Sequence, residues 1–126
     1  MNDTKYKINV TSETQYVEEQ SSPDAERYVF AYTITIKNTG QVSAKLLNRH
    51  WIITDASGHE QEVKGEGVVG EQPVLEPGEA FQYTSAAMLE TPVGSMYGSY
   101  EMLADDGVHF DAEISPFNLS IPRILH

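Results

Sequence analysis

Hydrophobic and polar residues alternate along much of this chain, which is the pattern of a strand with one face in a core. The run RYVFAYTITIKNTG shows it most clearly, because every second residue from Tyr28 to Ile36 is aromatic or aliphatic. The residues between them include two threonines and an alanine. Asn38-Thr39-Gly40 then supplies residue types that favour a turn. The run therefore predicts a half-buried strand that ends in a turn.

Other segments carry the same period of two. They are KYKINVTSETQYVEE near the start, VSAKLLNRHWIITDASG, PGEAFQYTSAAML, and the pair MYGSYEML and VHFDAEI. In the second of these, Leu47, Trp51 and Ile53 share a parity, so we expect them on one face of a strand. The last two meet across Ala104-Asp105-Asp106-Gly107, whose Asp-Gly pair is a strong hairpin signal. We expect strands at all of these positions, joined by turns.

The chain shows no helical period, internal repeat or change of composition that would mark a second domain. About seven strands at regular turn spacing are typical of an antiparallel β-sandwich of immunoglobulin or fibronectin type III. A chain of 126 residues is long enough to bury a core without disulfides or metals. We therefore predict an all-β fold with a single sandwich domain over residues 1–126. A small β-barrel is the alternative.

The charge balance and the lack of cysteine argue against several classes of function. The formal net charge is −11, from 19 acidic and 8 basic residues. It repels phosphate backbones and anionic lipids, so we expect neither nucleic acid nor membrane as a partner. Without cysteine there is no disulfide, thiolate nucleophile or thiolate zinc site. The start MNDTKYKINV does not resemble a signal peptide, and no apolar stretch is long enough to span a bilayer, so we expect a cytoplasmic protein.

A glycine motif raises the question of a nucleotide site. Gly65, Gly67 and Gly70 have the spacing G-x-G-x-x-G that holds the pyrophosphate of a dinucleotide in some enzymes. That motif needs a helix after the glycines, whereas Pro73 and Pro77 follow here among several glutamates. We interpret the glycines as residues that let a connection between strands adopt positive φ angles. We expect no nucleotide and no other cofactor.

Patterns for catalysis or metal binding are weak. No serine lies in a G-x-S-x-G elbow, and no pair of histidines has the spacing H-E-x-x-H among His50, His59, His109 and His126. His109 and Asp111 point to the same side of one strand, and they can share a metal with Asp105 or Asp106. We favour a solvated strand edge as the explanation. The sequence thus predicts no catalytic residue and no bound metal.

Several side chains are expected to have structural roles. Arg49 and Trp51 project from the same face of one strand, and we expect Trp51 to anchor the core while Arg49 pairs with a carboxylate at its rim. His50 is expected to be a strand residue whose ring is satisfied by a hydrogen bond. The segment LEPGEAFQY resembles the corner of a sandwich at which a tyrosine hydroxyl, here that of Tyr83, bonds to the backbone.

Five segments, taken in order, carry a resemblance to a known family. They are RYVFAYTITIKNTG, LLNRHWIITDASG, VKGEGVVGEQPVLEPGEAFQYTS, TPVGSMYGSYEML and FDAEISPFNLSIP. Through them the chain resembles the bacterial ApaG family from Arg27 to the C-terminus. The glycine motif of the family falls on the three glycines named above, and Ser115 before Pro116 departs from the usual apolar residue.

Membership of the ApaG family would carry several implications. The resemblance implies a fibronectin-type sandwich in a cytoplasmic bacterial protein. It also implies a loose association with magnesium and cobalt tolerance, and a gene neighbourhood shared with diadenosine tetraphosphate hydrolysis. In eukaryotes similar domains are appended to F-box substrate-recognition proteins and to a polymerase-interacting protein, which suggests a module that binds proteins.

Two functional hypotheses follow from the sequence. The first is a non-catalytic module that binds an unidentified protein partner, and the second is a cation- or nucleotide-binding protein, or an enzyme acting on nucleotides, that uses acidic groups or the glycine motif. Exposed edge strands make a homodimer an open alternative. The two valines of the glycine loop either anchor a partner or fold back over the end of the sandwich. The candidate contact loop comprises Gly65, Glu66, Gly67, Val68, Val69, Gly70, Glu71 and Gln72.

Overall fold

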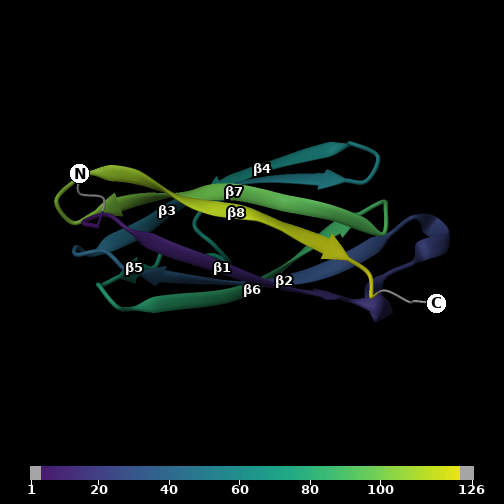
Figure 1. The fold of residues 1–126 in the computed structure, drawn as a ribbon, viewed down its shortest axis with the longest axis horizontal. Helices are drawn as coiled ribbons and strands as arrows, with labels where there is room; N and C mark the ends of the chain where they lie inside the picture. Colours follow the sequence, from purple (N-terminus) through teal and green to yellow (C-terminus); the bar gives the residue numbers. More distant parts are fainter. Residues whose placement is uncertain (1–3, 123–126) are drawn as a thin grey trace.

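The computed structural model of the protein describes residues 4–122, and strands dominate it (Figure 1). Every segment predicted to be a strand contains one, so the all-β prediction is confirmed. Within the described residues, no helix has the length and apolar character needed to cross a membrane. The elements in chain order are β1 (Ile8–Tyr16), η1 (Glu18–Gln20), η2 (Pro23–Ala25), β2 (Tyr28–Asn38), β3 (Ala44–Asp55), β4 (Glu60–Glu66), β5 (Val74–Leu75), β6 (Ala80–Leu89), β7 (Val93–Ala104) and β8 (His109–Ser120).

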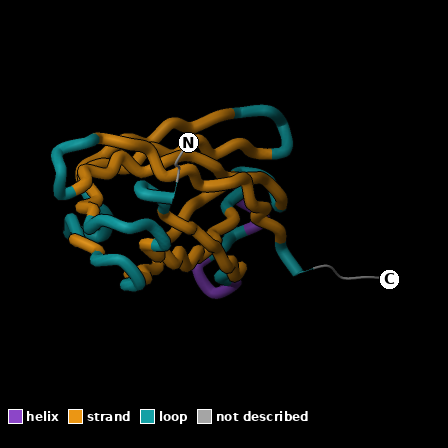
Figure 2. The backbone as a smooth tube through the Cα atoms, turned by 60° about the vertical axis from the view of Figure 1, so that its left-hand side comes forward, coloured by secondary structure: helices purple, strands orange, loops and turns teal. Residues whose placement is uncertain are grey.

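The strands form two antiparallel sheets that face each other as a sandwich. The smaller sheet has the order β1-β2-β6, and the larger has the order β4-β3-β7-β8, with β5 also paired to β3. The strands β3, β4, β7 and β8 lie above β1, β2 and β6 in Figure 1, and Figure 2 shows that helical backbone is confined to a short segment. The prediction of an antiparallel β-sandwich is thus confirmed, and the alternative of a closed barrel is wrong. The finer likeness to immunoglobulin or fibronectin domains stays a prediction.

Aromatic side chains from both sheets meet in the core. Trp51 on β3 is only 2 % exposed. Its ring meets those of Tyr32, Tyr100 and Phe117 edge to face, with centroids 5.5, 6.3 and 5.9 Å away. Because Tyr32 belongs to β2 in the opposite sheet, the indole joins the two layers. The prediction that Trp51 anchors the core is confirmed.

One predicted face assignment in β3 is wrong. Leu47 does not share the buried face of Trp51 and Ile53, and Leu46 is fully buried instead. A bulge between Leu46 and Asn48 shifts the register of β3 against β7. An extra residue at a bulge reverses the parity of the residues before it, so the simple alternation fails at this point.

The connection that leaves β4 positions the candidate loop. β4 ends at Glu66, so Gly65 and Glu66, which were expected in a loop, belong to a strand. The chain then adds β5 to β3 within the larger sheet and crosses to β6 in the smaller sheet (Figure 1). The side chain of Gln61 on β4 donates to the carbonyl of Met88 on β6 at 3.4 Å. The candidate loop therefore lies on the open side of the sandwich, between β4 and β6.

Candidate functional site

The loop after β4 ends in a tight turn. The amide of Val68 donates to the carbonyl of Glu71 at 2.8 Å, and the amide of Glu71 donates to the carbonyl of Val68 at 2.9 Å. Val69 and Gly70 between them have positive φ angles of 42° and 80°. A two-residue turn with positive φ at both central positions is of type I′, which favours Asn-Gly or Asp-Gly. Val69 is therefore a β-branched residue in a left-handed conformation that its side chain disfavours.

The two valines of the turn have opposite environments. Val68 is fully buried and belongs to the hydrophobic core. Val69 is 54 % exposed, and Glu66 and Glu71 near it are exposed as well. The sequence left two alternatives for these valines, and each describes one of them. Val68 folds back over the end of the sandwich, whereas Val69 is exposed to solvent and available to a partner.

Each glycine of the motif has a local structural reason. A side chain at Gly65 would place its Cβ 2.6 to 2.8 Å from three atoms of the Arg49 guanidinium. A side chain at Gly67, where φ is 66°, would collide with the carbonyl oxygen of Glu71. Gly70 holds the second central position of the turn. The spacing G-x-G-x-x-G therefore fits the packing of this loop on the sheet without any ligand.

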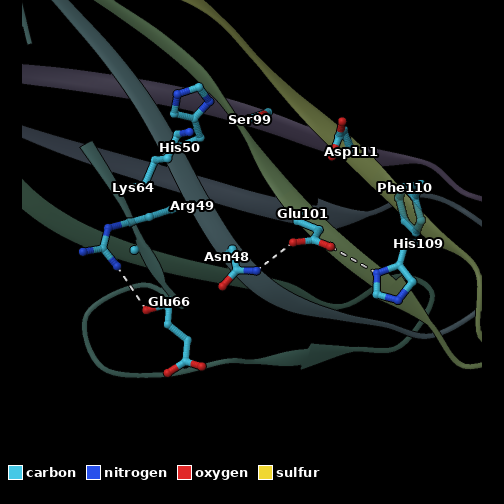
Figure 3. Close-up of a pocket in the computed structure, with 11 residues that line it drawn as sticks. Asn48, Arg49, His50, Lys64, Glu66, Ser99, Glu101, His109, Phe110 and Asp111 are labelled. Carbon is cyan, nitrogen blue, oxygen red and sulfur yellow. Dashed lines mark hydrogen bonds and ion pairs between the residues drawn. The ribbon is translucent and has the colours of Figure 1, made fainter. Parts of the chain in front are cut away.

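Arg49 ties the loop to the sheet. Its Nη1 donates to the carbonyl of Glu66 at 3.1 Å (Figure 3) and also to the carbonyl of Gly67 at 2.9 Å. The expected pairing with a carboxylate is wrong, because no ion pair of Arg49 occurs within residues 4–122. The guanidinium instead passes over Gly65, where no side chain blocks it, and reaches main-chain oxygens at the end of β4.

A small cavity lies between the turn and β6. Its volume is about 200 Å³, and its walls include Val69 and Gly70 from the turn, Tyr83 and Ser85 from β6, and Arg49 from β3. The turn and the inner face of β6 are therefore two walls of one opening on the side of the sandwich.

Tyr83 in the wall of this cavity does not form the predicted backbone contact. Its hydroxyl shares a hydrogen bond of 2.6 Å with the hydroxyl of Tyr100, which reaches it from β7 in the opposite sheet. Burial raises the pKa of Tyr83 to about 12 and also raises the pKa of Tyr100. Near neutral pH both phenols are therefore neutral hydrogen-bonding groups, and neither is poised to transfer a proton.

A wider groove lies on the outer face of the larger sheet, and its lining includes Gly65 and Glu66 of the candidate loop. Its volume is about 850 Å³, and polar side chains of β3, β4, β7 and β8 line it. Asn48 donates to Glu101 at 2.7 Å, and Nδ1 of His109 lies 3.2 Å from the other carboxylate oxygen (Figure 3). The hydrogen bond from Asn48, followed by that from His109, lowers the pKa of Glu101. These residues come from three strands, so no spacing in the sequence indicates their contact.

Two of the residues considered for a metal, His109 and Asp106, are held by other partners. His109 is paired across the groove, as described above, while Asp106 accepts a hydrogen bond from Tyr6 at 2.7 Å and pairs with Lys5 at 3.2 Å. The hydrogen bond from Tyr6, followed by the contact with Lys5, lowers the pKa of Asp106. Among residues 4–122, no group of three His, Asp or Glu side chains is arranged to hold a metal ion.

His50 has the hydrogen bond that was expected of a strand histidine. Its Nε2 lies 2.6 Å from a carboxylate oxygen of Glu62 on β4. Lys64 lies 3.8 Å from the same oxygen. The contact with His50, followed by that with Lys64, lowers the pKa of Glu62. His126, the last histidine of the sequence, lies outside the described residues.

Comparison with known proteins identifies the family. The ApaG domain matches residues 18–104. Protein ApaG from Thiobacillus denitrificans is 63 % identical over 122 residues, which are 97 % of this chain and 96 % of that protein. Protein ApaG from Azoarcus sp. is 60 % identical over 121 residues, which are 96 % of this chain and 95 % of that protein. A crystal structure of an ApaA protein from Bordetella pertussis is similar with a TM-score of 0.92 at 49 % identity, covering 94 % of this chain and 97 % of that one. The resemblance inferred from the five segments is confirmed, and the chain belongs to the ApaG family.

Proposed function

We propose that this protein is a non-catalytic module that binds another protein, with the turn at Val69 as its contact point. The observation that supports this proposal is an exposed, β-branched side chain in the left-handed region. Asn or Gly would be less strained in this turn. Strained residues persist where the surrounding structure holds them, and they cluster at functional sites. A turn selected for stability alone would therefore not carry valine here.

The loop is ordered before any partner binds. Reciprocal hydrogen bonds between Val68 and Glu71 close the turn, and the amide of Gly67 donates to the carbonyl of Leu47 at 2.8 Å. Arg49 and the buried side chain of Val68 fix the loop to the sheet and the core. A contact that is already ordered loses little conformational entropy on binding, so even a small apolar anchor contributes usefully to affinity.

The surroundings of Val69 indicate the chemistry of the partner. Glu66 and Glu71 are exposed near the anchor, and the whole chain has a net charge of −11. A shallow apolar pocket bordered by Lys or Arg suits this arrangement. The anchor would be desolvated in the pocket, while the charges at the rim would speed encounter and select the orientation.

The glycine motif offers few of the free amides that a phosphate needs. A phosphate-binding loop presents several unpaired backbone N–H groups, generally at the start of a helix. Here the amides of Gly67, Val68 and Glu71 already donate to carbonyls of the chain. The next element is β5, a strand of two residues. The geometry therefore favours a protein contact over a nucleotide site.

The substitution Val69→Asn removes the proposed contact without destabilising the fold. Asparagine tolerates the left-handed conformation, so the turn becomes the favoured Asn-Gly pair, and we expect the free energy of unfolding to rise by about 0.5–1 kcal/mol. Losing the apolar anchor should reduce the recovery of partner proteins when the tagged variant is incubated with a bacterial lysate. Recovery is quantified by mass spectrometry and stability by urea unfolding.

Val68→Ser is the matched control, one position away. It places a hydroxyl in the core, so it should lower the thermal midpoint while the protein that remains folded still recovers the partner. The proposal is wrong if Val69→Asn recovers the same proteins as the natural sequence in equal amounts.

A further inference from the structure

β6 is an unprotected edge strand. It is the last strand of the smaller sheet, with β2 on one side only. Its ten residues, AFQYTSAAML, include no charged residue and no proline. Its register with β2 is continuous, without a bulge. Natural proteins usually protect such an edge with charges, prolines, bulges or a covering segment, because its free backbone groups are a template for another strand.

The other edges of the sheets carry these protections. β4 has Glu60, Glu62 and Lys64 along its length. β8 contains Pro116 and a register shift against β7. β1, the other edge of the smaller sheet, carries Glu13 and runs beside β8 (Figure 1). β5 is only two residues long. Among the strands of residues 4–122, β6 therefore presents the one long edge without protection.

The backbone groups of β6 that face away from β2 can be assigned. The contact from Gln61 to the carbonyl of Met88 at 3.4 Å shows that this carbonyl points outward. Because the direction alternates along an antiparallel strand, the N–H and C=O groups of Gln82, Thr84 and Ala86 also point outward. No backbone hydrogen bond to these outward groups occurs within the described residues. Three successive positions are thus free to pair.

We propose that an extended segment of a partner protein adds to this edge as a further strand of the smaller sheet. This inference rests on the proposed function and specifies how the partner binds. The cavity of about 200 Å³ lies beside Tyr83, Ser85 and Val69, where an inward side chain of the added strand would enter. Main-chain hydrogen bonds would supply affinity, and this pocket would supply specificity. The edge and the turn at Val69 would contact the same partner.

The charges at the two ends of β6 indicate whether a partner segment or a second copy of this chain pairs with the edge. Glu79 precedes β6 and Glu90 follows it, and both are exposed. An uncharged strand with Lys or Arg at each end fits between them. Antiparallel pairing with a second copy would bring Glu79 of one chain near Glu90 of the other at both ends, which is unfavourable. The partner segment is therefore neutral in its centre and basic at its ends.

A selection from random ten-residue peptides displayed on phage, matched to the length of β6, tests the inference. The protein should enrich sequences with a neutral, alternating centre and basic ends. Ala86→Pro removes an outward N–H without touching the bonds to β2, and it should weaken binding of an enriched synthetic peptide by about tenfold or more. Ala86→Ser keeps that N–H and should bind the peptide as the natural sequence does.

Amide hydrogen exchange provides a readout that needs no variant. The enriched peptide should slow exchange at the amides of Gln82, Thr84 and Ala86. The inference is overturned if no sequence is enriched, if enriched peptides bind Ala86→Pro equally well, or if these amides become protected at high protein concentration without peptide, which would indicate self-pairing. If Val69→Asn loses partner recovery from lysate while Ala86→Pro keeps it, the proposed function stands and strand addition is wrong.

Discussion

Gly65→Ala tests whether Arg49 supports the candidate loop. The new methyl group would lie 2.6 Å from Nη2 and 2.7 Å from Cζ of the guanidinium, so the guanidinium must move. Its hydrogen bonds to the carbonyls of Glu66 and Gly67 would then break. Two hydrogen bonds from a charged donor at a partly exposed site correspond to a loss of about 1–3 kcal/mol in the free energy of unfolding.

The expected effect of Gly65→Ala on the free energy of unfolding changes once Arg49 is removed. In an Arg49→Ala background the methyl group at position 65 meets no guanidinium. Replacing a strand glycine by alanine should then be neutral or should stabilise the protein by about 0.5–1 kcal/mol. The coupling energy of the double-mutant cycle should therefore be at least about 1 kcal/mol.

Urea unfolding of the natural sequence, both single variants and the double variant measures this cycle. The chain has a single tryptophan, Trp51, whose fluorescence reports the transition. We expect equal m-values for the four proteins, because the substitutions lie in one small region. An equal cost of Gly65→Ala in both backgrounds would refute the guanidinium contact as the reason for this glycine.

Three further predictions follow from the core and the loop. Trp51→Ala should lower the free energy of unfolding by about 3–5 kcal/mol, because it removes the buried ring that joins the sheets. Since the variant lacks the fluorescent reporter, its urea unfolding is followed by circular dichroism, and an unchanged midpoint would contradict the prediction. The pKa of Tyr83 is raised from 10.0 to about 12 in the folded protein, so its contribution to stability is complete below pH 10 and is lost as the pH rises from 10 towards 12. Tyr83→Phe should therefore make the free energy of unfolding less dependent on pH in that window, which urea unfolding at each pH measures. NAD and diadenosine tetraphosphate should bind no tighter than about millimolar and should not be hydrolysed, and a micromolar Kd by calorimetry that Gly67→Ala abolishes would show otherwise.

Strand positions can be predicted from this sequence because one face of most strands is buried. Alternate residues from Phe30 to Ile36 enter the core, so the period of the sequence and the period of burial coincide. The position of β4 cannot be predicted in this way, because β4 is a solvated edge strand with charged residues along it and little burial. Leu47 is misplaced because a bulge changes parity without any change in residue type.

The candidate loop can be located from the sequence, but its contacts cannot be derived from it. The spacing of the glycines marks a turn, yet the turn type decides which valine is buried, and Val-Gly is not a pair that favours type I′. Arg49 bonds to main-chain carbonyls, which every residue possesses, so residue types do not reveal these partners. Asn48 and Glu101 meet because the register of β3 and β7 places them opposite each other.

The first and last strands start at the same end of the sandwich. Tyr6, just before β1, packs against Phe110 at the start of β8 in a tilted arrangement, with ring centroids 5.5 Å apart. β8 then runs for twelve residues, about 40 Å at 3.4 Å per residue, to the opposite end. In a multidomain protein, a domain joined before β1 and a domain joined after β8 would therefore lie at opposite ends of the sandwich (Figure 1). The fold would act as a spacer of that length between them. The flank formed by β6 would remain open to a third molecule between them.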